Sequence, residues 1–68
     1  MKTVDTRGLS CPQPLMMVHP FLSGKEAVEV LVDNEASREN VTRAAQKAGW
    51  TVVPQDCGDG VTRLELNR

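Results

Sequence analysis

A cysteine stands directly before a Pro-x-Pro sequence in the stretch Leu9-Ser10-Cys11-Pro12-Gln13-Pro14-Leu15. A proline is tolerated in the first turn of a helix because the N–H group that it lacks would have no partner there. The stretch therefore predicts that a helix begins near Pro12, with Cys11 at or beside its N-cap. The extended segment before it and the apolar run after it then form the first strand and the first helix.

This position predicts a reactive thiol at Cys11. Free N–H groups and the positive end of the helix dipole favour an anion at a helix N-terminus, and the thiolate is the reactive form of cysteine. A helix end contributes about 0.3–1 kcal/mol and up to about 2, so the pKa of the thiol falls only enough for partial ionisation near neutral pH. The alternative is an inert or buried cysteine in a proline-rich turn, and the chemistry alone leaves both open.

Length and charge exclude several classes of protein. Sixty-eight residues are expected to form one domain, 1–68, with a core too small for an internal cleft, so any chemistry should lie at the surface and be completed by a partner. Eight basic and nine acidic residues are scattered along the chain, unlike the basic surface of a nucleic-acid binder. No apolar run approaches the roughly 20 residues that span a bilayer, and no export signal is visible. We expect a cytoplasmic protein that contacts neither membrane nor nucleic acid.

The second cysteine, Cys57, follows Cys11 by 46 positions. A structural disulfide is not expected where thiols are kept reduced, and one histidine without a Cys-x-x-Cys pair predicts no metal site; no cofactor is expected. Cys57 is interpreted as a hairpin residue. The alternative is a resolving thiol that attacks a persulfide or sulfenic form of Cys11.

The N-terminal half predicts a strand, a helix and a second strand. Residues 2–7 are rich in β-branched side chains and are closed by Gly8, with Leu9 packing inward. Pro20 predicts that the first helix kinks or ends early. Residues 26–33 alternate and end almost wholly apolar, which favours a central strand. The buried stripe of the helix is expected to contain Leu15, Val18 and Leu22, widened by Met16, Met17 and Phe21, although one exposed methionine beside a docking thiol would make adaptable contacts.

The C-terminal half predicts a second helix and a hairpin. Ser37 is the expected N-cap, after a turn at 34–36, and Gly49 is the expected stop. Residues 50–55 form a strand that Pro54 assigns to an edge or a bulge. Residues 57–60 provide the turn, and 61–66 form the last strand. The small inner face of the helix comprises Val41, Ala44, Ala45 and Ala48. The predicted fold is α/β (α+β): a two-layer βαβαββ sandwich, with a four-stranded mixed sheet and both helices on one face.

Two stretches carry a resemblance to a known family: Val4-Asp5-Thr6-Arg7-Gly8-Leu9-Ser10-Cys11-Pro12-Gln13-Pro14, continuing through the helix, and Val30-Leu31-Val32-Asp33-Asn34. In these stretches the chain resembles the small sulfur-carrier family that includes TusA, SirA and YedF. The segment 32–41 is especially similar to the carrier-like domain of YedF, a name associated with selenium metabolism. The family fold is a βαβαββ two-layer sandwich, which agrees with the pattern above.

The resemblance implies a function and a set of site residues. Family members accept sulfur from a cysteine desulfurase as a persulfide and pass it to a downstream acceptor protein, for instance toward tRNA thiolation. Cys11 would hold the persulfide, so the protein would be a sulfurtransferase-like carrier rather than a self-sufficient enzyme. The supporting residues are Gly8, Leu9, Pro12 and Pro14 of the motif and the polar Asp5, Arg7 and Asp33. Two alternatives stay open: a thiol redox module that uses Cys11 with Cys57, and a non-catalytic interaction domain.

Overall fold

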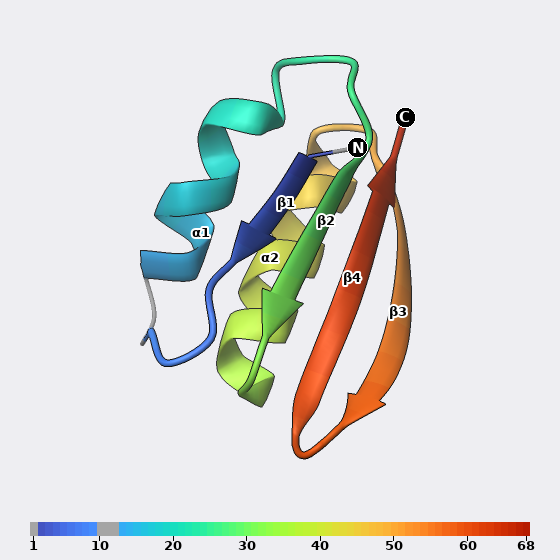
Figure 1. Ribbon diagram of the computed structural model, residues 1–68. Coiled ribbons are helices and arrows are strands. Elements are labelled where there is room, and N and C mark those ends of the chain that lie inside the picture. The colour runs from blue at the N-terminus through green and yellow to red at the C-terminus, as the bar shows by residue number, and fades with distance from the viewer. Residues whose placement is uncertain (1, 10–12) are drawn as a thin grey trace.

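Seven elements follow one another along the chain in the computed structural model, which describes residues 2–9 and 13–68 (Figure 1). They are β1 (Lys2–Asp5), α1 (Gln13–Val18), the 3-10 turn η1 (His19–Phe21), β2 (Val28–Val32), α2 (Glu35–Lys47), β3 (Thr51–Gly58) and β4 (Val61–Asn67). The predicted βαβαββ order is confirmed. Both helices cover the same face of the sheet, and the other face is uncovered (Figure 1).

The four strands form one mixed sheet in the order β1-β2-β4-β3. β1 pairs with β2 in parallel, and the other two pairings are antiparallel. β2 has a partner on each side, which confirms the central strand predicted from its apolar run. β3 forms an edge, as Pro54 predicted, because a proline has no N–H to give to a ladder.

The core lies between the sheet and the two helices. Alternate residues of β2 point into it, and the hydrophobic side chains of α2 and β4 meet them there. On the uncovered face, Arg63 forms ion pairs with Glu29 and Glu65, at 3.6 and 3.4 Å. This pattern of apolar and charged faces is what a half-buried sheet requires. The buried hydrophobic residues are Val4, Val18, Leu22, Val28, Val30, Val32, Val41, Ala45, Trp50, Leu64 and Leu66.

The first helix is shorter than its apolar run, and its buried side differs from the prediction. α1 ends at Val18 and continues as η1, which confirms that Pro20 ends it early. Pro14 and Val18 are its buried residues, whereas Met16 is 66% exposed and Met17 42% exposed. The prediction that the two methionines lie mostly in the core was therefore wrong. The buried positions 14, 18 and 22 lie on one side of the helical segment. Met16 and Met17 therefore lie on its exposed sides.

The second helix begins earlier than predicted. Asn34, in extended backbone geometry, is the N-cap, and its side chain accepts the backbone N–H of Ser37 at 2.8 Å. The prediction of Ser37 as the cap was wrong, because Ser37 lies buried inside the first turn. At the other end Gly49, with φ of +90°, donates to Gln46, and Trp50 donates to Ala45. These two bonds form a Schellman motif, so the predicted stop at Gly49 is confirmed.

Three strand boundaries also differ from the prediction. β1 ends at Asp5 rather than at residue 7, because the chain turns at residues 6–9. The ladder of β2 covers Val28–Val32 only. β3 runs on to Gly58, with a register shift between Asp56 and Gly58, so Cys57 lies in the strand rather than in the turn. Asp59 and Gly60 alone connect β3 to β4.

Candidate functional site

The candidate site is the segment around the Cys-Pro-x-Pro sequence, bounded by the turn after β1 and by the start of α1 (Figure 1). The predicted site residues Cys11 and Pro12 lie outside the described residues. The other predicted residues of the motif, Gly8, Leu9 and Pro14, are described. The geometry on either side of residues 10–12 is therefore where the site can be examined.

The turn that leads to the motif is fixed to the sheet by Thr6. The N–H and the side-chain hydroxyl of Thr6 both donate to the carbonyl of Leu31, at 3.0 and 2.6 Å. The N–H of Leu9 then donates to the carbonyl of Thr6 at 3.2 Å, which closes a four-residue turn. Gly8 has φ of +80° at the third position of this turn, as a type II turn requires. Leu9 is half-buried, so the predicted inward packing is partial.

Asp5 and Arg7 form a bidentate pair beside this turn. Nε and Nη2 of Arg7 donate to the two carboxylate oxygens of Asp5 at 2.9 and 2.7 Å, and the N–H of Arg7 donates at 3.0 Å. The side-chain hydrogen bond from Arg7 lowers the pKa of Asp5 to about 2, and Asp5 in turn raises the pKa of Arg7. The charge of Arg7 is thus mainly compensated by Asp5.

Asp33 and Asn34 connect the end of β2 to the same turn. A carboxylate oxygen of Asp33 accepts the N–H of Gly8 at 2.7 Å. The amide nitrogen of Asn34 donates to the other Asp33 oxygen at 3.2 Å and to the carbonyl of Leu9 at 3.5 Å. Because β1 and β2 are parallel, their C-terminal ends lie at the same end of the sheet. The side chains of Asp33 and Asn34 therefore reach the turn directly. Asp33, predicted as a supporting residue, thus lies against Gly8.

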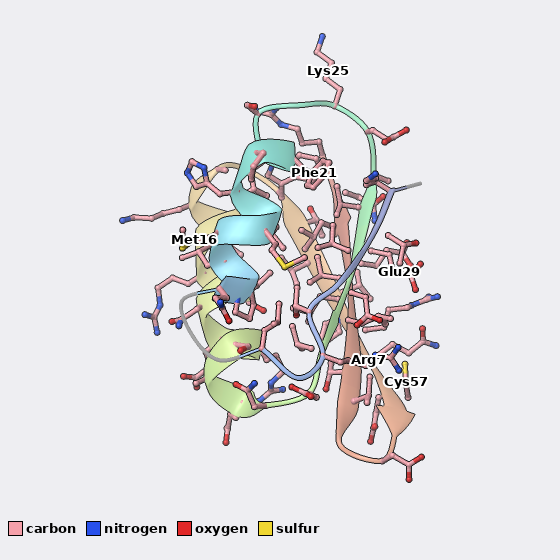
Figure 2. The ribbon with its side chains drawn as sticks, turned by 60° about the vertical axis from the view of Figure 1, so that its left-hand side comes forward. Arg7, Met16, Phe21, Lys25, Glu29 and Cys57 are labelled. Carbon is pink, nitrogen blue, oxygen red and sulfur yellow. The ribbon has the colours of Figure 1, made fainter. Side chains whose placement is uncertain are left out.

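On the other side of the motif, α1 presents an apolar surface. Pro14 is buried against the core, while Met16 and Met17 are exposed. Figure 2 shows Met16 on the outer side of α1, directed away from the sheet, whereas Glu29 lies on the uncovered face of the sheet. The helix therefore carries two flexible thioether side chains within six positions of Cys11 in the sequence.

Cys57 lies on β3, which β2 and β4 separate from β1 in the strand order. It is an exposed free thiol on β3, and its Sγ lies 3.8 Å from the carbonyl oxygen of Gln55. β3 and β1 are the two opposite edges of the sheet. In residues 2–9 and 13–68, no group of three His, Cys, Asp or Glu side chains could hold a metal ion. Within the same residues, no helix is long and apolar enough to cross a membrane.

Sequence reasoning missed Asn34 as a site residue. It was assigned to a turn, although Asn is one of the strongest N-cap residues and stands just before a good helical segment. That signal makes Asn34 a candidate start of the helix, but Ser37 is an equally good cap, so the sequence alone does not choose between them. The contact of Asn34 with Leu9 has no signal in the sequence, because the two residues are 25 positions apart.

Comparisons with known proteins agree with this architecture. The family model described as sulfurtransferase TusA matches residues 2–68. A "putative sulfur carrier protein" of Archaeoglobus fulgidus is 31% identical, and the match covers 94% of this chain and 88% of the relative. The crystal structure of a SirA-like protein from Desulfitobacterium hafniense is 31% identical, with a TM-score of 0.89, and the match covers 97% of this chain and 95% of the other.

The chain therefore belongs to the TusA family. This confirms the resemblance to TusA- and SirA-like proteins that the motif carries. Membership and the archaeal relative support the role of a sulfur carrier, which implies a sulfur donor and a sulfur acceptor as partners.

Proposed function

We propose that the protein carries sulfur as a persulfide on Cys11 and relays it from a cysteine desulfurase to an acceptor protein. The Cys11 thiolate attacks the outer sulfur of the persulfide on the donor. The donor's S–S bond breaks, its cysteine leaves as a thiolate, and Cys11 becomes the persulfide, so no external oxidant or reductant is needed. The observation that carries the proposal is the Gly-Leu-Ser-Cys-Pro-Gln-Pro sequence, 8–14, in a chain that the family matches over residues 2–68.

The geometry before the motif supports this role. Gly8 and Leu9 are held to β2 and to the residues that follow it through Thr6, Asp33 and Asn34. Pro12 and Pro14 restrict the backbone after the cysteine. A carrier needs such a stiff segment, because a sulfur transfer between two proteins depends on orientation. Asp5 and Arg7 neutralise each other, so we assign them to the shape and the charge balance of the turn.

The outer side of α1 supports a partner surface. Methionine side chains are flexible and polarisable, and they suit contacts with more than one protein. Met16 and Met17 are exposed directly after the motif, where a donor and an acceptor must dock in turn. We propose a cytoplasmic relay, in which thiols stay reduced. The resemblance suggests tRNA thiolation or selenium metabolism as the pathway of the acceptor.

The direct test is sulfur uptake measured by mass spectrometry. The protein is incubated with a cysteine desulfurase and cysteine, and the intact mass is recorded before and after treatment with a reductant. We expect one added sulfur that the reductant removes, and none in Cys11→Ser. If several desulfurases leave the mass unchanged, the relay is contradicted.

The alternative of a non-catalytic interaction domain makes a different prediction, which alkylation of the same purified protein tests. It requires Cys11 to react with iodoacetamide like a cysteine in a short peptide at every pH. A faster reaction that persists to lower pH would exclude this alternative, because it reports a stabilised thiolate.

A further inference from the structure

We infer that Asn34 is a positioning residue for Cys11: its side-chain amide fastens the segment before the cysteine to the first turn of α2. This inference rests on the sulfur-carrier function proposed above and deepens it. It is carried by three hydrogen bonds, which join Asn34 to Leu9, Asp33 and Ser37.

Each end of the amide has a different task. The oxygen accepts the N–H of Ser37 at 2.8 Å and so caps α2. The nitrogen faces two acceptors, the carbonyl of Leu9 at 3.5 Å and the carboxylate of Asp33 at 3.2 Å. This assignment of the two ends is unambiguous, because an N–H can only donate and the carbonyl can only accept.

Capping alone does not account for an amide at this position. Asp and Ser cap helices about as well as Asn. An aspartate would keep the capping oxygen but would place its second oxygen against the Leu9 carbonyl and the Asp33 carboxylate, where nothing donates. A serine would keep a capping oxygen and would lack any group for Leu9. Of these three side chains, only Asn serves both the helix and the turn.

The contacts of Asn34 converge on the last described residues before the cysteine. Leu9 precedes Cys11 by two positions, and its carbonyl is held directly. The N–H of Gly8 is held by Asp33 at 2.7 Å, and Asp33 is itself held by Asn34. The amide thus reduces the conformational freedom of the segment that enters the motif. A reaction that depends on the approach of one sulfur to another is sensitive to such freedom.

The substitution that separates the two tasks is Asn34→Ser, with Asn34→Asp as its charged counterpart. Asn67→Ser is the matched control, because the Asn67 amide also contacts one carboxylate, that of Glu65, but on β4. Three quantities are measured in each full-length variant: the midpoint of denaturant unfolding, the hydrogen-exchange rate of the Gly8 amide, and the rate of sulfur uptake at Cys11 from a cysteine desulfurase.

We expect Asn34→Ser to stay folded without denaturant and to unfold at a denaturant concentration only slightly below that of Asn67→Ser, since serine keeps the cap of α2 and loses only the contacts to Leu9 and Asp33. We expect the Gly8 amide to exchange up to about tenfold faster in Asn34→Ser, which corresponds to the loss of about one hydrogen bond. Sulfur uptake should slow by a similar factor, about tenfold, while Asn67→Ser keeps both wild-type rates. Asn34→Asp should slow uptake at least as much, although aspartate is as good a cap.

Two results would overturn the inference. One is wild-type Gly8 exchange together with wild-type uptake in Asn34→Ser. The other is a loss of uptake that only matches a loss of folded protein. If the wild-type protein itself takes up no sulfur, the proposed function fails, while Gly8 exchange still reports whether Asn34 holds the turn.

Discussion

At the scale of single residues, opposite charges beside the motif are arranged to cancel. The side-chain nitrogen atoms of Arg7 bind Asp5 in a bidentate manner, while the carboxylate of Asp33 accepts the backbone N–H of Gly8. Both members of the Asp5–Arg7 pair are about half exposed. An exposed pair of this kind contributes little to stability, so its main effect is on local charge and on the shape of the turn.

The first prediction concerns the ionisation of Asp5. Arg7→Gln should raise the pKa of Asp5 from about 2 toward its ordinary value of 3.8, because the side-chain hydrogen bond from Arg7 is the largest cause of the lowering. The pKa in the folded state is depressed, so the small stabilisation by the pair is present above pH 3.8 and is lost as the pH falls through about 2. The measurement is an NMR titration of the Asp5 carboxyl carbon.

Arg43→Gln serves as the control for this titration, since it removes an arginine from α2 and should leave the pKa of Asp5 at about 2. An unchanged Asp5 titration in Arg7→Gln would show that the pair does not form in solution.

At the scale of elements, the early end of α1 is compensated by Trp50. Because Pro20 ends α1 early, the last part of the apolar run is not in a regular α-helix, and Leu22 follows the 3-10 turn. The indole N–H of Trp50 donates to the carbonyl of Leu22 at 2.9 Å, in the interior, and Trp50 itself is 3% exposed. One side chain after α2 thus fixes the end of the first helical segment against the second helix.

The second prediction is that Trp50→Phe destabilises the protein by about 1–3 kcal/mol, because the Leu22 carbonyl loses a buried donor while much of the apolar contact remains. The free energy of unfolding is measured by circular dichroism in denaturant, since the substitution removes the only tryptophan. Val53→Ala is the control: Val53 is 50% exposed on β3, and its loss should cost less than about 0.5 kcal/mol. Equal costs in the two variants would mean that the indole bond contributes nothing.

Element order and strand roles could be predicted from the sequence, because they depend on local signals. Three such signals are the alternation at 28–32, the proline at 54 and the glycine at 49. Each of them leaves the backbone only a few conformations. The start of α2 was missed because Asn34 and Ser37 are both good caps. The outward direction of Met16 and Met17 was missed because every residue from Pro14 to Val18 is apolar, so no stripe stands out. Contacts such as the one between Asn34 and Leu9 join segments that are far apart in the sequence, so local sequence signals cannot predict them.

At the scale of the whole molecule, the strand order separates β3, which carries Cys57, from β1, the strand that precedes the motif in the sequence. The motif follows β1, at one edge of the sheet, and Cys57 lies on β3, at the other edge. Three spacings of about 4.8 Å separate the edge strands. A disulfide needs Cα atoms within about 7 Å of each other. Strands β1 and β3 are therefore too far apart for a direct disulfide between them, and Cys57 is exposed to solvent beside the hairpin.

The third prediction is that Cys57→Ser takes up one sulfur at the wild-type rate, because the relay needs a single thiol. Under mild oxidation, monomeric wild-type protein should keep two free thiols, counted by alkylation and intact mass, since Cys57 takes no part in the proposed one-thiol relay. Cys11→Ser is the matched control and should take up none. A Cys11–Cys57 disulfide that forms reversibly in the monomer would reverse this conclusion. The redox module would then replace the one-thiol carrier as the better account of the chain.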